Sequence, residues 1–174
     1  GNGDGVFAID STTGKVTTVK GLDYETIKSY VLTISVTDGA LADTAQLTIN
    51  VLDINEPPVV NNLSITLAED ATLGVIGTLQ YNDPEAASLI FTITAGNESG
   101  AFSVSNTGVI SLVKYLDYET KNSYLLIVSV NDGTSTVTAN VTITITNVNE
   151  LTLIEDATVS LAEDTAIGTL VKDF

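Results

Sequence analysis

The strongest constraint on the fold is an internal repeat. Residues 22–26, Leu-Asp-Tyr-Glu-Thr, recur 94 residues later as residues 116–120. At the same offset Asp38-Gly39 matches Asp132-Gly133, and residues 67–70 match residues 161–164. A fixed period of this kind indicates successive copies of one structural unit. We therefore expect a piece of a tandem array that is cut within its repeats.

The period divides the chain into one whole repeat and two partial ones. Pro57-Pro58 interrupts the strand pattern and stiffens the chain, which is typical of a linker between units. The predicted division is residues 1–56 as the C-terminal part of a repeat, 57–150 as a complete repeat, and 151–174 as the N-terminal strands of a further repeat.

Each repeat has the residue pattern of a β-sheet protein. Val, Ile and Thr supply 60 of the 174 residues, and β-branched side chains favour strands. Apolar and polar residues alternate along residues 30–37 and 141–146, as in antiparallel sheets with one buried face. The fold class predicted is all-β, with a seven-stranded Greek-key β-sandwich of immunoglobulin size in each complete repeat. Its strands are expected near residues 61–68, 74–83, 89–95, 102–104, 109–114, 123–131 and 136–147.

The composition excludes several classes of function. The formal net charge is −16, from 22 acidic and 6 basic residues, and Arg, His and Cys are absent. Without these residues there is no disulfide framework, no Ser-His-Asp site and no thiolate or imidazole metal ligand. The strong acidity excludes binding to nucleic acid. No apolar run is long enough to insert this segment into a membrane.

The acidic residues gather at strand ends and linkers, in the same places in both copies. Clustered carboxylates repel one another, and six lysines cannot neutralise them all. Carboxylate, amide and backbone oxygens are ligands for hard cations, and six to eight flexible oxygens suit Ca²⁺ better than Mg²⁺. The alternative is that these acids only keep the surface soluble and the strand edges unpaired. The repetition favours Ca²⁺.

The motifs resemble those of cadherin repeats, and more closely the bacterial cadherin-like type found in large secreted or surface adhesins. They are Leu22-Asp23-Tyr24-Glu25, alternating residues 30–39 that end in Asp38-Gly39, and Asp53-x-Asn55-Glu56-x-Pro58. The second copy repeats them as far as Asn149-Glu150, so the resemblance covers essentially the whole chain. It implies cadherin topology and an elongated array with Ca²⁺ between successive repeats.

The resemblance also implies ligands at each junction between repeats. At the first junction they are Asp23, Glu25, Asp53, Asn55, Glu56, Asp83, Glu85 and Asp132. At the second junction the upper repeat would supply Glu69, Asp117, Glu119, Asn149 and Glu150. Asn147 replaces the counterpart of Asp53, which removes one charge, so we expect tighter Ca²⁺ binding at the first junction. Both linkers also depart from the D-x-N-D-N of animal cadherins, so the number of ions at each junction stays open.

The expected function is an extracellular, calcium-stiffened spacer that supports adhesion at a cell surface and has no enzymatic activity. Its expected partners are the neighbouring repeats of the same chain, with homophilic association or a surface polysaccharide as further possibilities. An alternative is a filament subunit in which the half-repeats complete one another between chains. A polysaccharide-binding module is another; Tyr81 and Tyr115 are the aromatic residues outside the motifs that could serve it.

Overall fold

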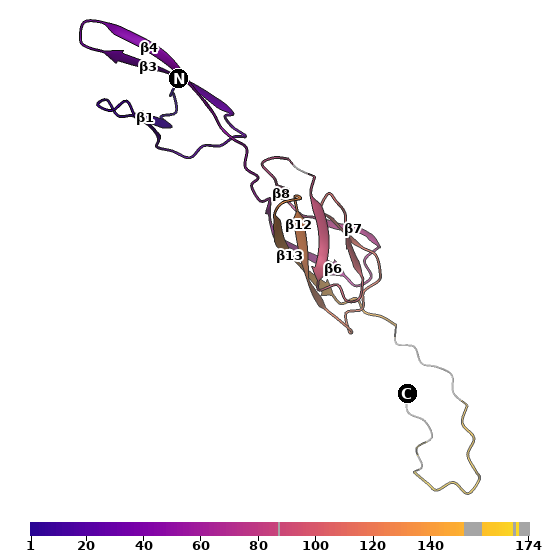
Figure 1. The fold of residues 1–174 in the computed structure, drawn as a ribbon. Coiled ribbons are helices and arrows are strands. Elements are labelled where there is room, and N and C mark those ends of the chain that lie inside the picture. The colour runs from indigo at the N-terminus through magenta and orange to yellow at the C-terminus, as the bar shows by residue number, and fades with distance from the viewer. Residues whose placement is uncertain (87, 152–157, 169, 171–174) are drawn as a thin grey trace.

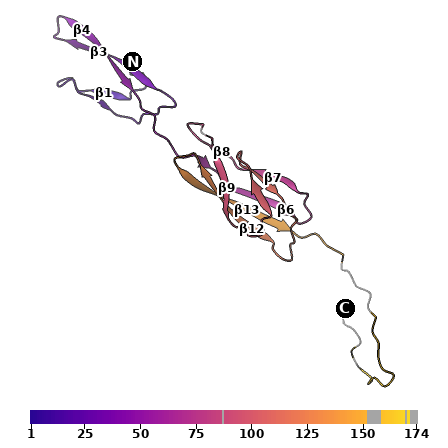
Figure 2. The same cartoon turned by 45° about the vertical axis from the view of Figure 1, so that its right-hand side comes forward.

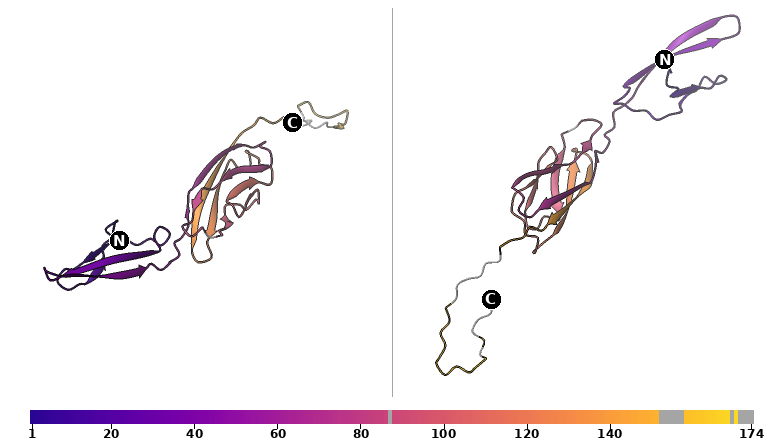
Figure 3. Two further views of the ribbon diagram at one scale, coloured as in Figure 1. Left: turned by 90° about the horizontal axis from the view of Figure 1, so that it is seen from above. Right: turned by 180° about the vertical axis from the view of Figure 1, so that it is seen from behind.

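The computed structural model describes residues 1–86, 88–151, 158–168 and 170. The described chain is elongated, with residues 57–150, the predicted complete repeat, in the middle and the N-terminal hairpins at one end (Figures 1 and 2). The views from above and behind show the same order (Figure 3). In these ranges no helix is long and apolar enough to cross a membrane.

Thirteen strands occur in the described ranges. They are β1 Phe7–Ile9, β2 Val16–Thr18, β3 Ser29–Thr37, β4 Ala42–Asn50, β5 Val59–Val60, β6 Leu63–Ala68, β7 Gly74–Thr78, β8 Tyr81–Asn82, β9 Ile90–Ala95, β10 Phe102–Val104, β11 Val109–Leu112, β12 Ser123–Asn131 and β13 Thr136–Thr146. The prediction of an all-β fold is confirmed.

The complete repeat is a sandwich of two main sheets. One sheet has the order β6-β13-β12-β9 and the other the order β10-β11-β7, while β5 and β8 form a separate two-stranded ribbon. β6 runs parallel to β13, whereas the other neighbouring strands are antiparallel. The predicted alternation holds along β12, where every second residue from Tyr124 to Val130 is buried.

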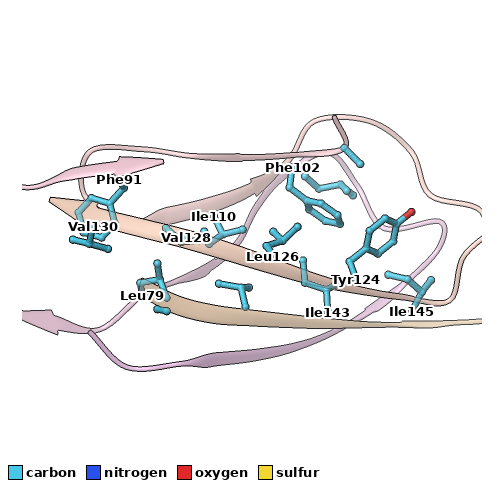
Figure 4. Close-up of a cluster of buried hydrophobic side chains, with 14 of the residues drawn as sticks. Leu79, Phe91, Phe102, Ile110, Tyr124, Leu126, Val128, Val130, Ile143 and Ile145 are labelled. Atoms are coloured by element: carbon cyan, nitrogen blue, oxygen red, sulfur yellow. The ribbon is translucent and has the colours of Figure 1, made fainter. Parts of the chain in front are cut away.

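The core lies between the two sheets (Figure 4). Leu126, Val128 and Ile143 are completely buried, and Phe102 packs against the Tyr124 ring with centroids 5.0 Å apart. Burial of each aliphatic side chain stabilises the repeat by about 1.5–3 kcal/mol. This core fixes the ends of the strands, and with them the loops that carry the acidic residues.

One predicted strand boundary is wrong. The sequence predicted a single strand over residues 74–83, but the structure ends β7 at Thr78 and starts β8 at Tyr81. The break arises because Leu79 turns into the core and its N–H donates to the Gly108 carbonyl at 2.9 Å. β8 then leaves the three-stranded sheet and pairs with β5.

The N-terminal 56 residues contain four strands, β1 to β4. They form two antiparallel hairpins, β1-β2 and β3-β4, over a small core of Val6, Phe7, Tyr30 and Leu32. The Phe7 and Tyr30 rings lie 4.9 Å apart and repeat the Phe102–Tyr124 contact. The inner side of this half-repeat carries an open groove of ≈ 260 Å³.

At the C-terminal end, the described residues 158–168 contain turns and no strand. Residues 152–157, which include part of the region where the first strand of a further repeat is expected, lie outside the described residues. The division into 1–56, 57–150 and 151–174 therefore stays a prediction.

Candidate metal centres

Three carboxylates from two successive repeats meet at the first junction. Glu25 lies in the turn before β3, Asp53 in the linker after β4, and Glu85 in the loop after β8 of the next repeat. One oxygen of each lies within 4.8 Å of the other two. They border a hollow of ≈ 310 Å³ that is also lined by Tyr24, Lys28 and Pro84. Since each acid comes from a different segment, a cation held here would join the repeats.

Glu85 is the centre of this group. Its Oε1 accepts a hydrogen bond from the Glu56 N–H at 2.9 Å, which lowers the pKa of Glu85. Its Oε2 is buried and has no hydrogen-bond partner among the described residues. A buried carboxylate oxygen without a donor is costly, and a bound cation would remove that cost.

The pKa of Glu56 is raised by the carboxylates around it. Its hydrogen bond with Glu85, partial desolvation of its carboxyl and the charges of Glu25, Glu85 and Asp53 raise the pKa of Glu56 to about 7. Without a cation, the junction therefore relieves part of the repulsion between its carboxylates by keeping a proton.

Two more predicted ligands meet beside this group. Asn55 donates from Nδ2 to Asp132 Oδ2 at 3.1 Å, which links the linker to the turn after β12. The N–H groups of Ser135 and Thr134 also donate to Asp132 and, together with Asn55, lower the pKa of that carboxyl. Asn55 and Asp132 thus connect the two repeats without a metal ion.

Asp23 and Asp117 lie outside the carboxylate groups and hold a local turn. Asp23 accepts bonds from the Thr26 hydroxyl at 2.8 Å and the Thr26 N–H at 3.1 Å, which lower its pKa. Asp117 makes the same two bonds to Thr120 and its pKa is lowered in the same way. Each turn carries the glutamate two residues later. The spacing Asp-x-x-Thr was a signal for this turn in the sequence.

Asp83 is half-buried, at the start of the turn that carries Glu85. Its carbonyl accepts the Ala86 N–H at 3.1 Å, and Ala86 has a positive φ of 52°. The carboxyl of Asp83 is not a member of the group formed by Glu25, Asp53 and Glu85.

A second group of three carboxylates forms at the other end of the complete repeat. One oxygen each of Glu69, Glu119 and Glu150 lies within 4.8 Å of the others. Partial desolvation of its carboxyl, followed by the charges of Glu69 and Glu119, raises the pKa of Glu150. The predicted ligand Asn149 is exposed in the linker between Val148 and Glu150.

Glu69 organises this second group. Its side chain is only 4% exposed, and it accepts bonds from the N–H of Tyr118 at 2.7 Å and of Val148 at 2.6 Å. Asn147, which sequence reasoning treated only as a lost ligand, donates to Glu119 at 2.5 Å. The backbone of Val148 and the side chain of Asn147 are therefore contributors that the sequence did not reveal.

The carboxylate groups at both junctions fit a hard cation. Every side-chain oxygen in the two groups belongs to a carboxylate. Such a set matches Ca²⁺ and offers nothing to a metal that prefers nitrogen or sulfur.

The comparison with known proteins decides the family. The sequence profile of the cadherin domain matches residues 1–52 and 63–146. The chain belongs to the cadherin-domain family. Its mouse relative Protocadherin Fat 4 is 34% identical over 86% of this chain, and human Protocadherin Fat 1 is 36% identical over 86%. The chain spans only 3% and 4% of these two relatives.

Solved cadherin structures share the fold. Human Protocadherin-24 EC1-2 (Form II) superimposes with a TM-score of 0.64 at 24% identity, over 84% of this chain and 79% of that one. Drosophila N-cadherin EC1-4 gives 0.60 at 26% identity, over 84% and 39%. The predicted cadherin β-sandwich is therefore confirmed. The bacterial type of repeat stays a prediction.

Membership in this family also confirms two broader expectations. Cadherin domains are extracellular modules of adhesion proteins, so the predicted extracellular or cell-surface location and the non-enzymatic class hold for this chain. The adhesive and mechanical role of the chain and its individual calcium ligands remain proposals.

Proposed function

We propose that this chain is a calcium-stiffened segment of an extracellular adhesion protein, in which Ca²⁺ at each junction locks neighbouring cadherin domains into a rod. The observation that carries the proposal is the convergence of Glu25, Asp53 and Glu85 from two domains, with the buried Oε2 of Glu85 lacking a donor. Glu56, Asn55 and Asp132 lie beside these three carboxylates and would supply further oxygen ligands to the first site.

Calcium would replace the proton held by Glu56 and neutralise carboxylates that otherwise repel. Because its ligands come from both domains, bending of the junction would break metal–oxygen contacts, and the bound ion would resist bending. Extracellular modules bind Ca²⁺ with dissociation constants of about 10⁻⁴–10⁻³ M, which suits the millimolar concentration outside cells.

The second site would use Glu69, Glu119 and Glu150 from the upper domain. Two of its neighbouring groups, the Val148 N–H and the Asn147 amide, already neutralise part of its charge by donating hydrogen bonds. The first group has the larger unsatisfied negative charge, so we expect it to bind Ca²⁺ more tightly.

Calorimetric melting and small-angle scattering in Ca²⁺ and in EDTA test the proposal. Chelation should lower the melting temperature and broaden the distribution of chain dimensions. The variant Asp53→Asn/Glu85→Gln should lose the tighter binding, and Glu119→Gln/Glu150→Gln the weaker one, when each is titrated with Ca²⁺. Asp43→Asn, in β4 away from both groups, is the matched control. Identical melting and scattering in Ca²⁺ and EDTA would exclude the proposal.

The structure adds little support for the polysaccharide-binding alternative. Tyr81 packs against the Phe91 ring with centroids 5.1 Å apart, so it belongs partly to the core. Tyr115 is 75% exposed, but a sugar platform normally needs more than one free aromatic ring. Adhesion through the repeats themselves is the better-supported function.

A further inference from the structure

The two linkers of the chain differ at one position that contacts a glutamate. Asp53 lies at the start of the first linker, and Asn147 lies 94 residues later, at the same place in the second. Each is close to a glutamate that recurs at the same offset, Glu25 at the first junction and Glu119 at the second. An ionised carboxylate can only accept hydrogen bonds, whereas an asparagine amide can also donate them. The change from Asp to Asn therefore turns a repulsive contact into an attractive one.

At the first junction the linker and the glutamate repel each other. An oxygen of Asp53 lies within 4.8 Å of an oxygen of Glu25, and both side chains are exposed. The hydrogen bonds of this linker come from residues 55–56, and they reach Asp132 and Glu85 of the next repeat. Two ionised carboxylates offer no donor, so only a cation or a proton makes the contact between Asp53 and Glu25 favourable.

At the second junction the same contact is a hydrogen bond. The Nδ2 of Asn147 donates to Oε1 of Glu119 at 2.5 Å. The next backbone N–H, that of Val148, donates to Oε1 of Glu69 at 2.6 Å. Glu69 is only 4% exposed, and its Oε2 accepts the Tyr118 N–H at 2.7 Å. These bonds attach the start of the second linker to the complete repeat without an ion.

The donors around the two carboxylate groups differ accordingly. The group of Glu69, Glu119 and Glu150 accepts three N–H hydrogen bonds, one from the Asn147 amide and two from the backbone. Among the described residues, the group at the first junction accepts one N–H bond, at Glu85. Hydrogen bonds to ionised acceptors are about twice as strong as those between neutral groups, so the three bonds replace part of the stabilisation that an ion would supply.

On the basis of the calcium function proposed above, we propose that Asn147 is a positioning residue, which holds Glu119 and the start of the second linker in place when no cation is bound. Calcium then controls the path of the chain at the start of the first linker, where Asp53 lies, more than at the start of the second. Whether this one position is Asp or Asn would decide how far a linker depends on the ion. Loss of calcium would loosen the chain first at the first junction.

Amide hydrogen exchange in EDTA measures the attachment of the second linker. The Val148 N–H should be protected in the wild type, and Asn147→Ala should reduce its protection at least tenfold, because a hydrogen bond to a charged acceptor contributes that much. Asn122→Ala is the matched control and should change the protection less than threefold. Asn122 is exposed at the same end of the repeat, where its backbone carbonyl accepts the Ile145 N–H. A wild-type Val148 that exchanges freely, or equal effects of the two variants, would overturn the proposal.

The substitution Asn147→Asp tests the dependence of the second linker on the ion. The new carboxylate would lie beside Glu119, so Val148 protection should fall in EDTA and return when Ca²⁺ is added. Calorimetric titration in the background Asp53→Asn/Glu85→Gln, which disables the first site, should show at least threefold tighter Ca²⁺ binding than with Asn147. Unchanged Val148 protection in EDTA, or weaker Ca²⁺ binding, would contradict the positioning role.

The reciprocal substitution Asp53→Asn tests the first junction. Its amide would donate to Glu25, so the melting temperature in EDTA should rise by roughly 2–4 °C and the further rise on addition of Ca²⁺ should shrink. A lower melting temperature in EDTA would refute the assignment. Circular dichroism verifies that every variant is folded. Insensitivity of wild-type melting to EDTA would exclude the calcium function alone, since the attachment by Asn147 is measured without the ion.

Discussion

Removal of the Glu69 side chain tests how the second junction is built. Glu69 is buried and accepts two backbone N–H bonds, from Tyr118 and Val148, and hydrogen bonds to a charged acceptor contribute about 1.5–3 kcal/mol each. The loss of both would cost about 3–6 kcal/mol. One opposing effect is the relief of repulsion with Glu119 and Glu150, whose oxygens lie within 4.8 Å. Because the side chains of Glu119 and Glu150 are exposed to solvent, this relief is about 1 kcal/mol per pair.

The net expectation for Glu69→Ala in EDTA is a destabilisation of about 3 kcal/mol, since the lost hydrogen bonds exceed the relieved repulsion. For a domain of this size that lowers the melting temperature of the complete repeat by roughly 12–24 °C. The difference should grow in 1 M NaCl, because salt screens the repulsion more than the buried bonds.

Differential scanning calorimetry in EDTA measures this difference. Asp70→Ala is the matched control, because it removes one negative charge at the adjacent, exposed residue. If Glu69→Ala melted within 3 °C of Asp70→Ala, the two bonds to Glu69 would not stabilise the junction, and the reasoning above would be refuted.

Two further predictions concern the backbone and pH. Gly96→Ala should destabilise the fold by more than 2 kcal/mol in urea, because its Cβ would lie 1.8 Å from the Leu125 carbonyl oxygen; Gly133→Ala, with open space around it, should cost only about 1 kcal/mol. Equal losses would contradict this close contact. In EDTA, the stabilising contribution of Glu56 should be full below its ordinary pKa of 4.5 and disappear as the pH rises through about 7, since the folded state binds the extra proton. Melting of Glu56→Gln should lack this pH dependence while Glu163→Gln retains it; a wild-type slope in Glu56→Gln would disprove the assignment.

The sequence predicted most of the fold because its signals were local and repeated. The alternation of β-branched and polar residues predicted the bounds of β9 to β13 closely, because one side of each strand is buried and the other is exposed to solvent. The break at Leu79 was missed because it depends on a tertiary contact with Gly108. The short pair β5-β8 was also missed, because two-residue strands have no periodicity to detect.

The sequence predicted which residues lie at each junction, but not which of their side chains contact one another. The resemblance to cadherin repeats placed Glu25, Asp53 and Glu85 at one junction, and the structure brings one oxygen of each within 4.8 Å of the other two. The motif resemblance did not separate Glu25 from Asp23, because both lie in the same segment Leu22-Asp23-Tyr24-Glu25. The separation comes from Thr26, whose hydroxyl and N–H occupy the carboxyl of Asp23 and leave Glu25 to face the linker. At the first junction, some carboxylates, such as that of Asp23, accept hydrogen bonds within a turn, and others, such as that of Glu25, lie close to carboxylates of the linker and the next repeat.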